Sequence, residues 1–351
     1  MRHLYVHVPF CARRCSYCDF AIAVRARVPV AEYLDGLGRE LELRFGAPRA
    51  GGERLELDTL YFGGGTPSRL GGEGIAAAIA RVRDHAGIAA GAEVTIEVNP
   101  DDVTDEALRR WRGAGVNRLS IGSQSFSDRA LGWMHRTHDS TGIGAAVARA
   151  RAAGITNYSL DLIFALPTDV ERSWADDLDR ALALQPSHLS LYGLTVEPGT
   201  PLGRWTERGL AHEAPEERYE EDFLLAHERL TAAGFRHYEV SNFARPGFES
   251  RHNSSYWGGA PYGGVGPAAH EFDGRRRRWN VAAYTEWMRA TAAGRDPVAG
   301  EEVLTGENRA AEDVYLGLRT DGGLEVGAGE LERVQRWVDA GWAVLDGHGG
   351  R

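Results

Sequence analysis

The residues with the clearest chemical potential are three cysteines close together near the N-terminus. Cys11, Cys15 and Cys18 are all the cysteines of the 351-residue chain, and their spacing is C-x3-C-x2-C. They follow an alternating apolar run over residues 4–8 that predicts a first strand. Three thiolates in one loop could hold three corners of an iron–sulfur cluster. A [4Fe–4S] cluster bound only by protein needs four cysteines, so one iron would stay open to an outside ligand.

Two other interpretations of these cysteines stay open. A structural zinc site prefers four ligands, usually in two separated pairs, and would need His7 or a distant histidine to complete it. Three inert core thiols fit less well, because buried cysteines normally lie on apolar faces and this loop carries arginines. A disulfide framework is not expected from an odd number of cysteines in a large chain.

Further polar or glycine-rich positions follow predicted strands. Gly63, Gly64, Gly65 and Thr66 come directly after a strand over 57–62, and glycines let the backbone approach a ligand closely, although a triple glycine is more often only a turn. Three more polar residues interrupt or end otherwise apolar strands: Glu97, Gln124 and Asp161. A carboxylate at such a position is costly unless a partner bonds to it. Ribose hydroxyls are suitable donors, and a neighbouring arginine would satisfy Glu97 equally well.

Strands and helices alternate along the first two thirds of the chain. Strands are predicted over 4–8, 57–62, 93–98, 118–124, 158–164 and 188–194, and helices over 31–45, 74–86, 104–113, 139–153, 171–184 and 215–233. This order predicts an α/β fold with a parallel sheet, namely a partial (β/α)6 TIM-like barrel. No G-x-G-x-x-G follows the first strand, which argues against a dinucleotide-binding sheet. In barrels the chemistry lies at the carboxyl ends of the strands, where the residues above are expected.

The composition changes near residue 245. Residues 1–244 are expected to form the barrel, and residues 245–351 a smaller, mostly helical C-terminal domain with helices over 281–292, 307–317 and 328–339. Residues 340–346 predict the end of a helix followed by a strand without a partner, so we expect this domain to be cut short.

Charge and composition exclude several classes of function. The net charge of −10 argues against a nucleic-acid partner. The chain contains no lysine, which excludes a P-loop and Schiff-base chemistry. No apolar run approaches the roughly 18 residues of a membrane span, and neither end resembles a signal peptide. A cytoplasmic location is expected, and its reducing conditions fit the cysteine usage.

The cysteine spacing, with Tyr17 before the third cysteine, resembles the signature of the radical S-adenosylmethionine (radical SAM) superfamily, and Gly63-Gly64-Gly65-Thr66-Pro67 resembles its SAM-contacting motif. The resemblance covers most of the chain. It implies a [4Fe–4S] cluster on Cys11, Cys15 and Cys18 whose open iron binds SAM. It also implies an electron donor, because the cluster reduces SAM by one electron to give methionine and a 5′-deoxyadenosyl radical.

Matched by position, the chain is similar to the coproporphyrinogen-dehydrogenase-like branch of that superfamily. The SAM contacts that this branch implies are Tyr5, Tyr17, Gly64, Gly65, Thr66, Glu97, Gln124, Arg136 and Asp161. Arg136 would pair with the SAM carboxylate; otherwise it is an ordinary surface arginine. The sequence departs from the branch at Ala165 and Thr168, where relatives usually have glycine.

The run His252-Asn253-Ser254-Ser255-Tyr256-Trp257 resembles the H-N-x-x-Y-W motif of HemW-type heme chaperones. The resemblance implies that His252, from a loop, ligates heme, that Tyr256 and Trp257 pack on it, and that heme passes to respiratory proteins. The dehydrogenases of this branch carry a further cysteine two residues after the third cluster cysteine, where this chain has Phe20, and they also have an N-terminal extension. We therefore expect a chaperone without dehydrogenase activity, and oxygen-independent coproporphyrinogen III dehydrogenase is the alternative.

The arginine run at 275–278 has two candidate partners. Its guanidinium groups could meet heme propionates, or an anionic membrane surface that would hold the protein at the inner face of the membrane. Both segments could also have only a structural role. The aromatic segment at 252–257 would then pack at a domain junction, and the arginine run would be a solvated turn.

Overall fold

The structure is a computed structural model, and it describes residues 1–46, 55–327 and 329–345. A row of parallel strands forms its centre. These strands are β1 (His3–Val8), β4 (Glu56–Gly64), β5 (Gly87–Val98), β6 (Arg118–Gln124), β7 (Tyr158–Phe164) and β8 (His188–Gly193). They lie side by side in this order, each parallel to the next. The predicted α/β fold with a mostly parallel sheet is therefore confirmed.

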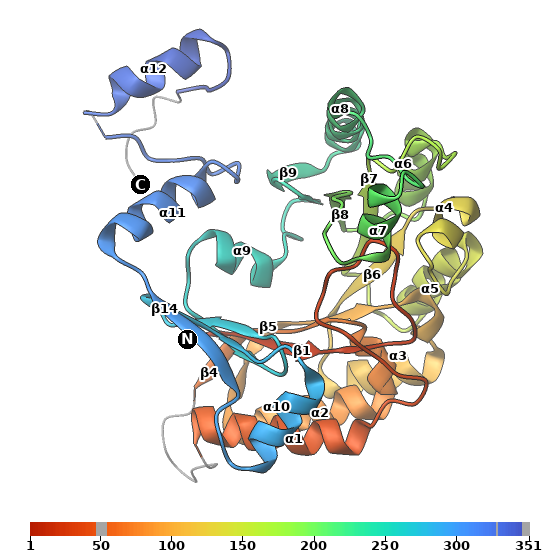
Figure 1. Cartoon of the computed structure of the whole chain (residues 1–351), viewed down its shortest axis with the longest axis vertical. Helices are drawn as coiled ribbons and strands as arrows, with labels where there is room; N and C mark the ends of the chain where they lie inside the picture. Colours follow the sequence, from red (N-terminus) through yellow and green to blue (C-terminus); the bar gives the residue numbers. More distant parts are fainter. Residues whose placement is uncertain (47–54, 328, 346–351) are drawn as a thin grey trace.

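Helices connect these strands, and the longer ones cover the outer side of the curved sheet (Figure 1). They are α1 (Val30–Phe45), α2 (Gly71–His85), α3 (Asp105–Ala114), α4 (Asp128–Trp133), α5 (Ser140–Ala152), α6 (Trp174–Ala183), α7 (Pro201–Glu207) and α8 (Glu216–Ala232), with short 3-10 turns η1 (Pro67–Leu70) and η2 (Pro100–Asp102). Apolar residues at helical spacing, such as Leu37 and Leu41 of α1, are fully buried in the core beneath the sheet.

Helix α3 illustrates how local sequence sets these boundaries. The side chain of Thr104 accepts a hydrogen bond from the amide of Ala107 at 3.1 Å, which caps the first turn. Leu108 and Trp111 are fully buried on one face. Gly115 ends the helix in the left-handed region at φ 106°, where a side chain would be strained.

The sheet continues at both edges beyond the parallel strands. On the β8 side it adds β10 (Asn242–Ala244) and β9 (Arg236–Glu239), both antiparallel. On the β1 side it adds β11 (Tyr262–Val265), which is parallel to β1, and then β12 (His270–Phe272), β13 (Arg276–Asn280) and β14 (Val298–Val303), which are antiparallel. The result is a 12-stranded sheet among the described residues. The separate strands β2 (Phe10–Cys11) and β3 (Ala23–Val24) bracket the cysteine loop.

Strands β11 to β14 differ from the sequence prediction, which placed no strand between residues 245 and 303. The glycines Gly263 and Gly264 prevent β11 from being predicted from the sequence, because a glycine-rich segment lacks the apolar periodicity of a strand. At Gly264 an added Cβ would lie 2.0 Å from the carbonyl oxygen of His270, so only glycine lets the two strands approach. The division of the chain at residue 245 stays a prediction, and the sheet runs across it.

The remaining helices are α9 (Arg251–Trp257), α10 (Tyr284–Ala292), α11 (Gly306–Gly317) and α12 (Leu331–Asp339). Helix α9 lies on the inner side of the curved sheet, opposite the outer helices (Figure 1). The strand expected at the C-terminus is absent over 342–345, and Asp346 lies outside the described residues.

Candidate functional site

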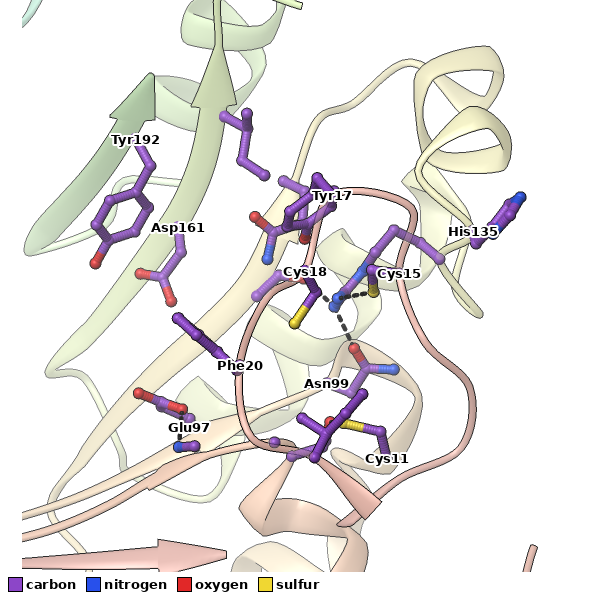
Figure 2. A pocket seen from close by; sticks show the side chains of 18 of the residues that line it. Cys11, Cys15, Tyr17, Cys18, Phe20, Glu97, Asn99, His135, Asp161 and Tyr192 are labelled. Atoms are coloured by element: carbon purple, nitrogen blue, oxygen red, sulfur yellow. Dashed lines mark hydrogen bonds between the residues drawn. The ribbon is translucent and has the colours of Figure 1, made fainter. Parts of the chain in front are cut away.

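The three cysteines line one cavity at the carboxyl ends of the parallel strands. The loop that carries them starts in β2 and returns in β3, where the amide of Ala23 donates to the carbonyl of Pro9 at 2.7 Å. Cys11 is buried, and Cys15 and Cys18 are partly exposed to the cavity. The cavity has a volume of about 420 Å³ (Figure 2), within the usual range for ligand sites.

Glycines bring the end of strand β4 against this loop. Gly64 has φ 115°, in the region that side chains rarely adopt. At Gly65 an added Cβ would lie 2.6 Å from the carbonyl oxygen of Pro9 and 3.1 Å from the sulfur of Cys11. The hydroxyl of Thr66 lies 3.5 Å from the same sulfur. The glycines are therefore required for the β4 backbone to reach the cysteine loop.

Two carboxylates face the cavity from β5 and β7. Glu97 accepts hydrogen bonds from the hydroxyl of Tyr61 at 2.9 Å and from the amide of Gly64 at 3.1 Å. Burial raises its pKa to about 7, although these two hydrogen bonds oppose the shift. Asp161 accepts from the hydroxyls of Ser120 at 2.8 Å and Ser159 at 2.9 Å, and burial raises its pKa as well.

Arg136 brings a positive charge to the cysteine loop. It donates to the sulfur of Cys15 at 3.4 Å, to the carbonyl of Gly122 at 2.9 Å and to the side chain of Asn99 (Figure 2). Its Nε is buried and has no hydrogen-bond partner among the described residues. An anionic ligand group in the cavity would satisfy this nitrogen.

Burial keeps two of the thiols, those of Cys11 and Cys18, in the protonated form in the ligand-free protein. Burial raises the pKa of Cys11 and raises that of Cys18 to about 11. Metal binding requires thiolates, so loading would release protons. No group of three or more metal-ligating side chains in the described residues could hold a single metal ion, which does not support the zinc alternative. Three thiols around one cavity, with the backbone of Gly65 pressed against them, fit an iron–sulfur cluster with three protein ligands.

Comparison with known proteins shows which family the chain belongs to. The model of the radical SAM superfamily matches residues 5–181. The chain belongs to the radical SAM superfamily. It also belongs to the HemW family within it: the chain is 40% identical to the heme chaperone HemW of Mycobacterium tuberculosis over 357 residues, which cover 99% of this chain and 89% of the relative.

Other relatives agree with this radical SAM assignment. HemW of Bacillus subtilis is 34% identical over 328 residues, covering 92% of this chain and 85% of the relative. HemW of Escherichia coli is 37% identical over 268 residues, covering 76% and 69%. Among solved structures, coproporphyrinogen III oxidase HemN from Escherichia coli matches with a TM-score of 0.78 and 24% identity, covering 96% of this chain and 78% of that chain. At 24% identity, this match shows that the two chains share a fold and nothing more.

Most residues predicted to contact SAM line the same cavity of this radical SAM chain as the three cysteines. They are Tyr17, Gly64, Gly65, Thr66, Glu97, Gln124, Arg136 and Asp161. Tyr5 is not among them. Its hydroxyl lies 3.2 Å from Nδ1 of His7, and its ring stacks on Tyr61.

Sequence reasoning missed other residues of the cavity. Asn99 follows β5, and Tyr192 lies in β8 with 45% of its surface exposed. Both obey the rule that found Glu97 and Asp161, namely a polar group at the end of a parallel strand. Phe20, 61% exposed, is directed from the cysteine loop toward the carboxylates of Glu97 and Asp161 (Figure 2).

His252 differs from the sequence prediction, because it lies in helix α9 and not in a loop. Only 1% of its surface is exposed, and its ring stacks on Tyr61 with a centroid distance of 5.0 Å. Nδ1 lies 2.7 Å from the hydroxyl of Thr59, and Nε2 lies 2.8 Å from that of Tyr256. Burial lowers its pKa to about 3, so the ring is neutral.

The other two residues of the predicted heme motif lie apart. Tyr256 lines a second cavity, which also includes Tyr5 and His7, whereas Trp257 lines neither cavity.

None of the helices in the described ranges has the length and apolarity that crossing a bilayer requires.

Proposed function

We propose that this chain is a heme chaperone built on a radical SAM scaffold, and that it delivers heme to heme-containing respiratory proteins. The observation that carries the proposal is the similarity to HemW chaperones over almost the whole chain. The presence of Phe20 at the position where the dehydrogenases carry a cysteine supports it. The partners would be met in the cytoplasm or at the inner face of the membrane.

The cysteine cavity would hold a [4Fe–4S] cluster and SAM. Cys11, Cys15 and Cys18 would ligate the cluster, and the amides and carbonyls around Gly64 and Gly65 would meet the amino and carboxylate groups of SAM. The unpartnered Nε of Arg136 is a donor for that carboxylate. Glu97 and Asp161 would accept hydrogen bonds from ribose hydroxyls.

When bound and reduced by an electron donor, the cluster supplies one-electron reduction of SAM. The residues of the chain orient the ligands and restrict water. Tyr17 packs on the apolar cluster of Leu131, Met134 and Ile163, which fixes the wall of the cavity beside Cys18. Arg136 offsets the negative charge of the thiolates.

Heme binding by His252, Tyr256 and Trp257 remains a proposal drawn from the motif. Both ring nitrogens of His252 already have partners, so iron ligation by Nε2 would require Tyr256 to move away from it. The alternative function, oxidative decarboxylation of coproporphyrinogen III, would use the same cavity for the cluster and SAM.

One set of measurements on anaerobically purified protein tests these functions. We expect about four iron and four sulfide per chain, following the cluster composition, a Soret shift on titration with hemin, and no propionate-to-vinyl conversion of coproporphyrinogen III with SAM and a reductant. Cys18→Ala should lose the iron and sulfide. Ser16→Ala is the matched control in the same loop, because the Ser16 hydroxyl is buried without a partner among the described residues.

The contrary outcomes are distinct. Vinyl product would assign the dehydrogenase activity, and zinc in place of iron would identify a zinc-stabilised module. Absence of hemin binding by the wild-type chain would refute the chaperone proposal.

A further inference from the structure

A second cavity of about 540 Å³ lies between the inner side of strand β1, helix α9, strands β11 to β13 and helix α11. Its size falls in the range of small-molecule and cofactor sites, about 300–1,000 Å³. Aromatic and apolar side chains form much of its wall: Tyr5, Tyr256, Tyr262, Phe272, Tyr315 and Leu316. Tyr315 is 54% exposed, so the cavity opens to solvent beside α11.

One imidazole in this cavity is available to a ligand. His270 is exposed and stacks on Trp279 with a centroid distance of 6.0 Å and an interplanar angle of 24°. In the described part of the chain, neither of its ring nitrogens has a hydrogen-bond partner. By contrast, the two nitrogens of His7 lie 3.2 Å from the hydroxyl of Tyr5 and 3.1 Å from the carbonyl of Ala21. Partial burial and then the charge of Arg277 lower the pKa of His270, which favours the neutral ring that binds iron.

Two guanidinium groups complete the cavity. Arg277 and Arg309 both lie over the ring of Phe272, each 5.4 Å from its centroid. Arg277 donates to both carboxylate oxygens of Glu312, at 2.9 and 3.2 Å, and to Glu302. Arg309 donates to the carbonyl of Gly259 and pairs with Asp313. Of the arginine run at 275–278, only Arg277 lines this cavity.

We propose that the second cavity is the binding site for heme, with His270 as the protein ligand to iron and Arg277 and Arg309 as the partners of its carboxylates. The inference rests on the proposed heme-carrier function and specifies where the heme would bind. A planar tetrapyrrole has apolar faces for the aromatic wall, a metal for one imidazole, and two carboxylates for the two guanidinium groups.

The geometry favours His270 over the motif residue His252. Tyr256 lines the cavity and His252 does not; the Tyr256 hydroxyl contacts His252 Nε2, and the Thr59 hydroxyl contacts Nδ1. Ligation by His252 would break a buried hydrogen bond and leave a buried hydroxyl unpaired. His270 needs no such rearrangement, and His252 acts in the packing of α9 inside the barrel.

The test is titration of the full-length, anaerobically purified chain with hemin, followed by absorbance and electron paramagnetic resonance. His270→Ala should weaken hemin affinity at least about tenfold, because even residues that only orient a metal ligand contribute about 10–100-fold. It should also remove the signature of histidine-ligated ferric heme. His212→Ala, an exposed histidine outside both cavities, should leave affinity and spectrum unchanged.

Metal-free protoporphyrin IX separates ligation from the shape of the cavity. His270→Ala should weaken hemin alone, whereas Arg277→Ala should weaken both compounds by roughly 10–150-fold, the range for one hydrogen bond to a charged group. Glu312→Gln should tighten binding of both, because it releases Arg277 and removes a negative charge from the cavity.

The results distinguish the two proposals. No hemin binding by wild type would refute the heme-carrier function. Wild-type binding with unchanged affinity and spectrum in His270→Ala would overturn this site. Equal weakening of hemin and protoporphyrin by His270→Ala would overturn the ligand assignment. Loss of ligation in a His252→Ala variant that keeps its circular dichroism and melting temperature would assign the ligand to His252.

Discussion

Glu97 is a buried carboxyl group whose pKa is raised toward neutral pH. Its pKa of about 7, against an ordinary 4.5, means that the folded protein binds a proton between these values that the unfolded chain does not. This contribution to stability is fully present below pH 4.5 and is lost as the pH rises through 7. Its full size is at most about 3 kcal/mol, since one pKa unit is about 1.4 kcal/mol, and water in the cavity reduces it.

We therefore expect the free energy of unfolding of the ligand-free chain to fall, relative to Glu97→Gln, by about 1–3 kcal/mol between pH 5 and pH 8. Urea denaturation of both variants at the two pH values measures this, because all other titrating groups are common to them. Glu56→Gln, an exposed carboxylate at the start of β4, is the control and should follow wild type. Parallel pH profiles of wild type and Glu97→Gln would contradict the shifted pKa.

At the scale of single residues, sequence reasoning found the cysteine cavity because one rule applies there. Residues at the carboxyl ends of neighbouring parallel strands converge whatever the intervening sequence contains. Tyr5 and His252 came from the family resemblance and not from this rule, and Tyr5 lies in the middle of β1. The contact of His252 with Thr59 joins residues 193 positions apart, and no local pattern reveals such a pair.

Helix α9 is the element that sequence reasoning described least well, and a buried carboxylate on β5 fixes it. Glu93 accepts hydrogen bonds from the amides of Arg251 at 3.0 Å and His252 at 3.1 Å, at the start of the helix. The hydroxyl of Ser250 caps the same turn through the amide of Asn253. A seven-residue helix is not stable alone, so these bonds and the packing of His252 hold it inside the barrel.

Glu93→Gln should lower the free energy of unfolding by about 1–3 kcal/mol, because glutamine has one acceptor oxygen for the two amides and lacks the charge that strengthens both hydrogen bonds. It should also speed amide hydrogen exchange in residues 251–257 more than in α3. Glu106→Gln changes a carboxylate in the first turn of α3 that is solvent-exposed, and it should cost less than about 1 kcal/mol. Unaltered exchange in α9 of Glu93→Gln would refute this anchoring role.

The alternation of strands and helices could be predicted because local residues mark where the helices end. Gly115, Gly154 and Gly234 each stand between an alanine and an apolar residue after a helix, and all have positive φ, as expected for residues that end helices. Strands β11 to β14 could not be predicted in this way. They are short, β11 is glycine-rich and β13 arginine-rich, and β11 pairs with a strand at the other end of the chain, β1, while β12, β13 and β14 pair within this group of four.

At the scale of the whole molecule, Glu40 joins the barrel to the C-terminal strands. This fully buried carboxylate of α1 accepts hydrogen bonds from the amide of Gly266 at 2.8 Å, the side chain of Asn280 at 2.7 Å and the indole of Trp287 at 2.7 Å. It also pairs with Arg44 at 3.0 Å. Burial raises its pKa, and the charge of Arg44 opposes that shift. One carboxylate thus satisfies donors from three separate segments between residues 266 and 287.

Glu40→Ala should therefore lower the free energy of unfolding by about 3–5 kcal/mol, the cost of removing one partner of a buried ion pair. Glu42→Ala, two positions along the same helix and exposed, is the matched control and should change stability by less than about 0.5 kcal/mol. Denaturant unfolding measures both, and hydrogen exchange shows where protection is lost.

If the residues after 245 fold independently of the barrel, Glu40→Ala will increase hydrogen exchange only in β11, β13 and α10. If the continuous sheet makes them one cooperative unit, as the pairing of β11 with β1 indicates, exchange will rise in β1 and β4 as well.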